Sequence, residues 1–417
     1  MSNQDGDFSS NSSIDSGLPG GIGGASDVFT ETTSRSWFSR IGDSLKGILI
    51  GLLLVIAAGV LMFWNEGRSA KTVAALREGA GLVMSVAVDK LDTANEGKLV
   101  HVAGDTASAQ GVRDPDFGFA ASGLKLSRTV EMFQWKETSQ SETQKKLGGG
   151  EETVTRYSYT REWSEKAIDS SRFRNPADHR NPQMPSVASR EYAAQDARLG
   201  AFRLGPNVIN LLSADDKTDV PQTALAQARE KLGGRARIAQ GIVYAGSNPD
   251  QPLVGDVRVS WTVAPLTQVS VVGRQTQTGL SPWQAGNQRE ILMAEKGIVD
   301  ARTMFKHGED ENALLTWILR VVGFVLMFAG FRALLSLFEV LADIIPFFGN
   351  IVGAGASLVA LLLTLVLAPV IIAIAWIFYR PLVAIGVLIV GAGLAYGVRA
   401  LMKGRTATAA ARAGASG

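Results

Sequence analysis

Long apolar runs without charged residues are the feature of this sequence that most limits its fold. There are four of them: 47–64, 313–338, 344–379 and 381–398. The first and last have eighteen residues each and the third has thirty-six, all without a charge, while the second is interrupted only by Arg320 and Arg332. About 20 apolar residues span a hydrocarbon core of roughly 30 Å. Because the buried helices of soluble proteins are seldom so long and so close together, the sequence predicts four transmembrane helices.

The charged residues that flank these runs predict the orientation of the chain. Arg35, Arg40 and Lys46 precede the first run. The charged residues after the fourth run, among them Arg399 and Lys403, are all basic. Basic residues near membrane helices are retained in the cytoplasm. Four crossings return the chain to its starting side, so we expect both termini in the cytoplasm and residues 65–312 across the membrane.

The predicted organisation has seven parts. They are a disordered cytoplasmic tail at 1–44, transmembrane helix 1 at 45–64, an extracytoplasmic domain at 65–312, helix 2 at 313–338, helix 3 with an interfacial entry at 344–379, helix 4 at 381–400 and a basic cytoplasmic tail at 401–417. The first tail is rich in Gly, Ser, Asp and Asn and too poor in apolar residues to order itself. The domain carries 31 acidic and 31 basic residues, so no net charge draws it to nucleic acid or to an anionic membrane.

Alternation of apolar and polar residues predicts that the extracytoplasmic domain is rich in strands. The clearest patterns are at 124–136 and 155–163, and we expect the polar stretch 138–152 between them to be an exposed hairpin loop. Further strands are predicted at 98–103, 236–244, 256–263 and 267–274, and helices at 68–79, 220–232 and 298–306. The predicted fold class is α+β: a multipass helical membrane protein with four transmembrane helices and a large strand-rich extracytoplasmic domain between helices 1 and 2.

Residues suited to catalysis or cofactor binding are scarce. The chain has no cysteine, and its three histidines, His101, His179 and His307, are far apart in sequence. Metal sites and activated nucleophiles need such residues at close spacing. Asp114 and Asp116 flank a proline, but two carboxylates do not complete a calcium-binding loop. The sequence therefore predicts no enzyme, no catalytic residue, no metal site and no cofactor.

Two similar tetrapeptides are candidates for an interaction or structural role. Asn65, Glu66, Gly67 and Arg68 follow the first apolar run, and the tetrapeptide Asn95-Glu96-Gly97-Lys98 repeats the pattern later in the chain. Asn and Gly favour turns that need a positive φ. We therefore expect both motifs to be turns, with a shared ligand-binding role as the alternative.

Aromatic and basic residues complete the set of candidates. A docking function predicts an exposed aromatic patch, formed by Phe133, Trp135, Tyr157 and Tyr159. Arg380 and Pro381 are expected to turn the chain between helices 3 and 4.

Arg320 and Arg332 lie within the second apolar run. Our first interpretation is that both extend to the lipid headgroups. The alternative is that Arg332 pairs with Glu339 or Asp343, or contacts an anionic lipid.

Several of these motifs, in this order, resemble the LUMA family (transmembrane protein 43). They are residues 65–72, 95–101, 130–137, 155–163, 255–260 and 378–382. The resemblance implies one membrane helix, a large lumenal domain and a closing group of helices. For a eukaryotic protein it also implies the endoplasmic reticulum or the inner nuclear membrane, where members bind lamins and emerin. The Gly- and Ala-rich composition without cysteine favours a bacterial member, to which the architecture carries over but those partners do not.

The predicted function is that of a non-enzymatic integral membrane scaffold, which organises membrane-associated protein complexes through its extracytoplasmic domain. The alternative is a membrane protein that binds or handles lipid or a small molecule at the junction of domain and helix bundle. Expected partners are membrane lipids and unidentified membrane or periplasmic proteins, with homo-oligomerisation left open and nucleic acid excluded. The expected location is the bacterial inner membrane, with residues 65–312 periplasmic.

Overall fold

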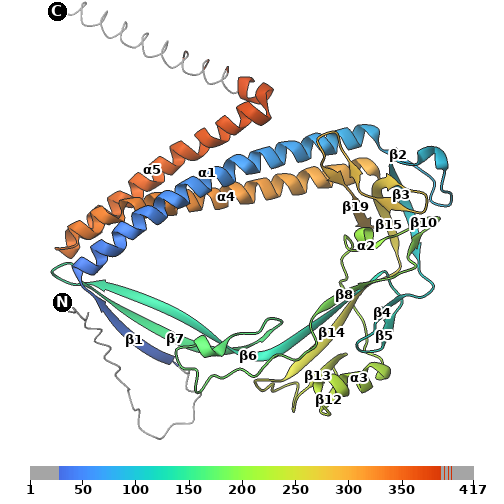
Figure 1. Cartoon of the computed structure of the whole chain (residues 1–417), viewed down its shortest axis with the longest axis horizontal. Coiled ribbons are helices and arrows are strands. Elements are labelled where there is room, and N and C mark those ends of the chain that lie inside the picture. The colour runs from blue at the N-terminus through green and yellow to red at the C-terminus, as the bar shows by residue number, and fades with distance from the viewer. Residues whose placement is uncertain (1–27, 387–388, 390–392, 394–395, 397–417) are drawn as a thin grey trace, which may run out of the picture. The chain divides into compact units, whose positions relative to one another are not determined.

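The computed structural model describes residues 28–386 together with 389, 393 and 396 (Figure 1). These residues belong to two units. The strand-rich unit comprises the described residues up to Ser36, followed by Ala75–Lys146 and Gly150–His307. The helical unit comprises Trp37–Ala74, Leu147–Gly149 and the described residues from Gly308 onward. The mixed α+β class with apolar membrane helices is thereby confirmed.

Three long helices dominate the helical unit. They are α1 (Trp37–Leu82), α4 (Ala301–Ala342) and α5 (Pro346–Tyr379). Within the described residues, these are the helices long and apolar enough to cross a membrane. Helix α1 extends to Leu82, as predicted from residues 68–79. Pro346 lies in the first turn of α5, where its missing N–H leaves no hydrogen bond unmade.

The predicted fourth transmembrane helix, at 381–400, falls mostly outside the described residues. Residues 381–386 are helical, and α5 ends just before Arg380 and Pro381. The predicted basic tail, 401–417, also lies outside the described part of the chain.

Two antiparallel sheets form most of the strand-rich unit. The larger has the order β1-β7-β6-β14-β13-β12, with β8 beside β6 and β11 beside β14. Its strands are β1 (Val28–Arg35), β6 (Lys125–Lys145), β7 (Glu151–Ser164), β8 (Arg190–Ala193), β11 (Asp216–Lys217), β12 (Ala236–Ala239), β13 (Ile242–Ala245) and β14 (Val257–Ala264). The predicted strand at 236–244 is thus a hairpin, because Gln240 and Gly241 both take a positive φ and turn the chain.

The smaller sheet has the order β10-β9-β3-β15-β16, with β19 beside β15 and β2 parallel to β3. Its strands are β2 (Met84–Ser85), β3 (Leu99–Ala107), β9 (Arg198–Leu199), β10 (Phe202–Arg203), β15 (Gln268–Gln275), β16 (Leu280–Ser281) and β19 (Met293–Lys296). Two short pairs and two short helices complete the unit: β4 (Val112–Asp114) with β5 (Phe119–Ala121), β17 (Trp283–Gln284) with β18 (Glu290–Ile291), α2 (Pro206–Ile209) and α3 (Gln222–Leu232).

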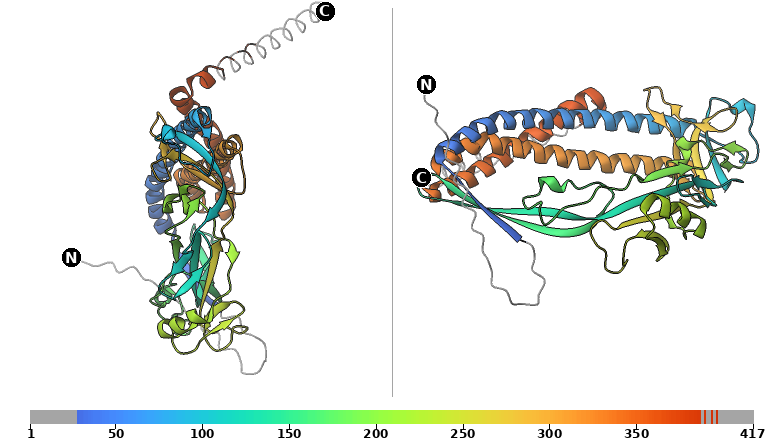
Figure 2. Two further views of the ribbon diagram at one scale, coloured as in Figure 1. Left: turned by 90° about the vertical axis from the view of Figure 1, so that its right-hand side faces the viewer. Right: turned by 60° about the horizontal axis from the view of Figure 1, so that its bottom comes forward.

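The hairpin of β6 and β7 is much longer than predicted (Figure 2). Residues 138–152, which we expected to be a loop, are mostly strand, and the turn is confined to the segment closed by the bond from the Lys146 N–H to the Gly150 carbonyl. Hydroxyl groups pair across the two strands, Ser141 with Thr155 and Thr143 with Thr153, both at 2.9 Å. Such a ribbon is polar on both faces, so it lacks the apolar alternation that identifies strands in a sequence.

Strand β1 corrects the prediction that the whole tail 1–44 is disordered. Val28–Arg35 pairs antiparallel with β7 from Val28–Ser158 to Arg35–Glu151, and α1 begins at Trp37. Only residues 1–27 of the predicted tail lie outside the described part of the chain. Residues 28–35 and 151–158 are thus neighbours in one sheet, although the apolar part of α1 lies between them in the sequence.

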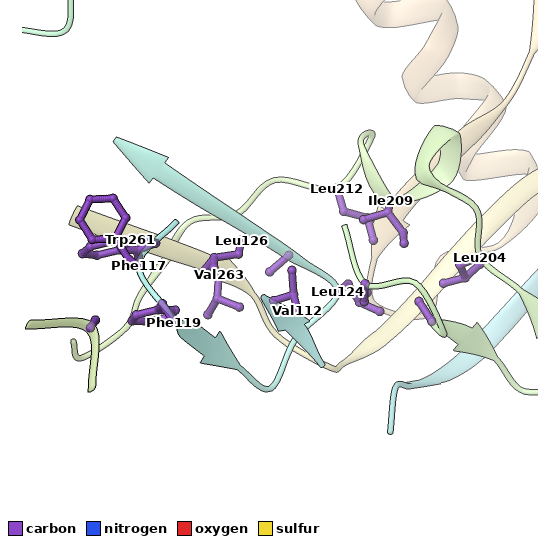
Figure 3. Close-up of a cluster of buried hydrophobic side chains, with 14 of the residues drawn as sticks. Val112, Phe117, Phe119, Leu124, Leu126, Leu204, Ile209, Leu212, Trp261 and Val263 are labelled. Atoms are coloured by element: carbon purple, nitrogen blue, oxygen red, sulfur yellow. The ribbon is translucent and has the colours of Figure 1, made fainter. Parts of the chain in front are cut away.

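The largest hydrophobic core contains side chains from both sheets, from α2 and α3 and from the loops beside them, and Figure 3 shows part of it. The indole of Trp261 stacks on Phe119 and meets the edge of Phe117, with both ring centroids at 5.1 Å. A buried ion pair lies in this core: Arg128 donates to both carboxylate oxygens of Asp114, and the Trp261 N–H donates to the same group at 3.0 Å. Asp114 is therefore held by a guanidinium and an indole. Within the described residues, no group of His, Asp or Glu is arranged to hold a metal ion.

Candidate functional site

The motif after the first apolar run lies inside a helix. Asn65, Glu66, Gly67 and Arg68 continue α1 without a break, so their prediction as a turn is wrong. Asn65 and Glu66 are almost completely buried, with exposed fractions of 0% and 1%. Buried polar groups need partners, and these come from α4 and α5, far away in the sequence.

Glu66 lies at the centre of this polar cluster. Arg320 on α4 donates from Nε to one carboxylate oxygen at 2.7 Å and from a terminal nitrogen to the other at 3.0 Å. The indole N–H of Trp376 on α5 donates to Glu66 at 2.8 Å. Arg320 also lies over the ring of Trp317, at 4.7 Å. The carboxylate thus joins all three helices, and Arg320 is not simply extended to the headgroups as we first interpreted it.

The rest of the cluster is a network of amides, hydroxyls and guanidinium groups. Arg68 donates to the side-chain oxygen of Asn312 at 2.9 Å and to the Thr316 hydroxyl at 3.1 Å, both on α4. The Asn65 amide donates to the Thr316 carbonyl at 3.0 Å. Arg380 donates to the Ser69 hydroxyl at 3.2 Å. Three arginines and one glutamate give these residues a net charge of +2.

Gly67 is required for packing. A Cβ atom at this position would lie 2.6 Å from the ring of Tyr379 on α5. By contrast, the similar motif at Asn95–Gly97 does form a turn: the Lys98 N–H donates to the Asn95 carbonyl, and Gly97 has a φ of +79°. The two tetrapeptides therefore have different roles, and the structure does not bring them together.

A second polar cluster occupies the other end of the apolar part of α1. Arg40 on α1 makes an ion pair with the fully buried Asp343 and donates to the Gly149 carbonyl at 2.6 Å. The Trp37 indole donates to the Val340 carbonyl at 2.8 Å. Arg332 pairs with Glu339 at 2.6 Å, which confirms one of the two carboxylate partners expected for it. The Arg40–Asp343 ion pair joins α1 to the turn after α4, whereas the charge-assisted bonds of the Glu66 cluster join α1 to α4 itself.

The four predicted docking aromatics share one face of the hairpin, but they do not form an exposed patch. In the register, Phe133 is opposite Trp163 and Ser139 is opposite Tyr157, which places all four side chains on the same side. The loop after β7 covers this face: His179 stacks on Tyr159 with ring centroids 3.7 Å apart and meets the edge of Trp135 at 4.7 Å. Tyr159 is 8% exposed. Phe133, Trp135 and Tyr157 are half-buried, so the loop covers much of this face.

The phenol of Tyr159 provides a test of this packing. Burial, followed by its hydrogen bond to Glu137, raises the pKa of Tyr159 to about 12. The unfolded chain releases this proton near pH 10. The contribution to stability is therefore complete below pH 10 and is lost as the pH rises toward 12. The measurement is the phenolate absorbance of the full-length protein as a function of pH. We expect Tyr159→Phe to remove the component of this titration that has its midpoint near pH 12. A removed component with a midpoint near 10 would show that the phenol is in water.

Several residues of the polar cluster were missed by sequence reasoning. Asn312, Thr316 and Trp376 are ordinary residues near helix ends in the sequence, and none was singled out. Their position in the sequence could have identified them, because each lies within about two helical turns of a charged residue at the border of an apolar run. Polar residues at such borders in different helices are natural partners for one another.

Known proteins of similar sequence match most of the chain. The family model described as Transmembrane protein 43 matches residues 132–381. Transmembrane protein 43 of Mus musculus is 31% identical over 365 residues, covering 85% of this chain and 89% of its own length. The human protein of that name is 31% identical over 370 residues, covering 86% of this chain and 91% of its own length. The Drosophila melanogaster homolog is 28% identical over 355 residues, covering 82% and 92%.

No solved structure matches the chain. The match to the family model and the coverage of these relatives include both the apolar helices and the strand-rich unit. The chain therefore belongs to the transmembrane protein 43 (LUMA) family.

Proposed function

We propose that this membrane protein is a non-enzymatic scaffold, which organises membrane-associated protein complexes through its strand-rich unit. The observation that carries the proposal is the outer half of the β6–β7 hairpin. Residues 138–144 of β6 are all exposed, and β14 and β8 pair with β6 only between Lys125 and Met132. Beyond Trp135, one edge of β6 therefore has no strand partner in the described part of the chain. An open edge of this length is suited to pairing with an extended segment of another protein.

Hydrogen bonds show which residues of β6 face the open edge. The N–H groups of Phe133 and Trp135 bond to Asp256 and Asn181, away from β7. The Lys146 N–H bonds back to Gly150, on the β7 side. Because backbone groups alternate along a strand, odd-numbered residues from Phe133 to Lys145 point to the open edge. Ser139, Ser141 and Thr143 therefore present their backbone groups to a partner.

Proline at an odd position tests the proposal. Ser141→Pro removes an outward N–H and the hydroxyl pair with Thr155 but keeps the backbone bonds to β7, whereas Gln140→Pro removes a backbone bond to β7. In the full-length protein in its native membrane, a photoreactive residue at position 139 should cross-link the partner protein. We expect Ser141→Pro to abolish this cross-link. The matched control Ser141→Thr keeps both the N–H and the hydroxyl, so cross-linking should remain. Equal cross-linking by Ser141→Pro and Ser141→Thr would overturn the scaffold mechanism.

The pairing of β1 with β7 changes the proposed orientation. Residues 28–35 precede the apolar part of α1 and residues 151–158 follow it, yet the two segments are hydrogen-bonded to each other in one sheet. Strand β6 has 21 residues and α1 has 46, so each extends about 69 Å. A polar ribbon with open edges does not cross a hydrocarbon core. We therefore propose that the apolar part of α1 is held in the membrane without carrying β1 to the side opposite β7.

A groove in the helical unit favours lipid binding within the helix bundle, rather than at its junction with the strand-rich unit as the alternative had it. A cavity of about 280 Å³ between α4 and α5 is lined by Phe324, Val325, Phe328, Ser357, Leu358 and Leu361. Such a lining fits a lipid acyl chain. Filling the groove with Ser357→Phe should then reduce the lipid that co-purifies with the protein, whereas a scaffold without this function would show no change.

A further inference from the structure

A polar pocket in the strand-rich unit has no part in the proposed scaffold function. Its volume is about 510 Å³, within the range of small-molecule sites. The wall is formed by residues in and next to β4, by β8 and a residue that follows it, and by α2 with the adjoining Asn210. The residues that matter for the argument are Arg113, Arg190, Glu191, Tyr192 and Asn210.

The lining has an excess of positive charge. Arg113 and Arg190 are exposed, and neither makes an ion pair with a carboxylate in the described part of the chain. Lys125 lies behind the wall with an exposed fraction of only 6%. Its ammonium group is 3.1 Å from the carboxylate of Glu191 and 3.5 Å from the Asn210 carbonyl. Three cations and one carboxylate give these groups a net charge of +2.

The carboxylates nearby do not neutralise this charge. Asp114 and Asp116 are held by Arg128, and Asp196 accepts bonds from the Ser108 hydroxyl and from the N–H groups of residues 109 and 110. None of these three carboxylates lines the pocket. Within the described residues, the carboxylate in an ion pair with the Lys125 ammonium is that of Glu191, which is 55% exposed, and Asp215, which also attracts this ammonium, is bound by Lys296. The buried ammonium is therefore incompletely compensated, which favours a second anion there.

The arginines are suited to a tetrahedral or planar anion. Arg190 lies over the ring of Tyr192, 5.5 Å from its centroid, which limits the positions that its guanidinium can adopt. A guanidinium donates two parallel hydrogen bonds to phosphate or carboxylate. Of these two anions, phosphate fits the pocket better. A phosphate monoester carries about two negative charges at neutral pH, which matches the net charge of +2 on Arg113, Arg190, Lys125 and Glu191.

We propose that this pocket binds a phosphate monoester, with Arg113 and Arg190 as the residues that contact its phosphoryl oxygens. The volume leaves room for an organic group beyond the phosphate. The organic group belongs either to a soluble metabolite or to a lipid with a terminal phosphate. The two sources share the same chemistry at the arginines.

Binding measurements on the full-length protein in detergent test the site. Glycerol phosphate is titrated by calorimetry against the wild type, Arg113→Gln, Arg190→Gln and the control Arg235→Gln, an exposed arginine that does not line the pocket. We expect saturable binding, weakened about tenfold by each pocket variant and unchanged by the control. Because both pocket arginines are exposed, the variants should fold like the wild type, which their thermal unfolding will show.

A second arm separates the two sources. The same proteins are tested for capture by phosphatidylcholine vesicles with and without phosphatidic acid. Capture that depends on phosphatidic acid and on both arginines, without binding of glycerol phosphate, supports the site with a lipid as its source. If neither probe binds, or if both bind equally to the pocket variants and the wild type, the proposal is wrong.

Discussion

Replacement of Glu66 by alanine is expected to destabilise the helical unit by about 3–5 kcal/mol, the cost of breaking a buried ion pair. The variant leaves the guanidinium of Arg320 and the indole N–H of Trp376 without the carboxylate that joins them. Glu66 is 1% exposed, so little water is available to replace it. The measurement is the unfolding of the full-length protein in detergent, followed by the loss of helical circular dichroism.

The chain contains a matched control for this variant. Glu96 occupies the same place in the similar tetrapeptide, but it is exposed in a turn. Glu96→Ala should change stability by less than about 0.5 kcal/mol. The double variant Glu66→Leu with Arg320→Met should be more stable than either single variant, because an apolar pair leaves no buried charge unpaired. If Glu66→Ala is as stable as Glu96→Ala, the polar cluster does not hold the helices together.

Alanine at either glycine of the α1–α4 crossing is expected to force these two helices apart. A Cβ atom on Gly51 would lie 2.7 Å from the Gly330 carbonyl oxygen, and one on Gly330 would lie 2.8 Å from the Gly51 carbonyl oxygen. Backbone atoms cannot rotate away as a flexible side chain can. We expect each substitution to cost about 1–3 kcal/mol in the same unfolding assay.

Gly355 on α5 provides the control for the crossing. A Cβ atom there meets nothing within 4 Å, so Gly355→Ala should be neutral or slightly stabilising through its higher helix propensity. If the Gly51→Ala and Gly330→Ala proteins are as stable as the Gly355→Ala protein, α1 and α4 do not cross at these glycines. Small residues at such a contact are typical of membrane helices, which gain little from burying apolar surface against one another.

The sequence predicted helices and strands well where the pattern of apolar residues was strong. The first three apolar runs and the alternation at 256–263 correspond to α1, α4, α5 and β14, whereas the fourth run lies mostly outside the described residues. The outer half of the β6–β7 hairpin and strand β1 escaped prediction because their residues are polar on both faces. In such segments, the pairing partner determines the strand, and the partner is not visible in the local sequence.

The polar cluster could be predicted only in pieces. Glu66, Arg68 and Arg380 were identified as candidates from their place beside apolar runs, but as residues of turns. Whether Gly67 permits a turn or a close helix contact depends on Tyr379, more than three hundred residues away. The type of a residue limits the contacts that it can make. Helices that are distant in the sequence determine which of these contacts it does make.

Cysteine pairs test most directly whether β1 pairs with β7 although the first apolar segment lies between them in the sequence. The natural chain has no cysteine, so Thr33→Cys with Thr153→Cys, which are register partners, can be oxidised in native membranes without background. The control is Thr33→Cys with Thr143→Cys, because Thr143 pairs with the far side of Thr153 and lies about two strand spacings, roughly 9–10 Å, from Thr33. That separation is too long for a disulfide.

We expect a disulfide in the first pair and none in the control pair. We also expect a membrane-impermeant maleimide to reach positions 33 and 153 from the same side. No disulfide in the first pair, together with labelling of the two positions from opposite sides, would contradict the pairing and restore the orientation predicted from the flanking charges.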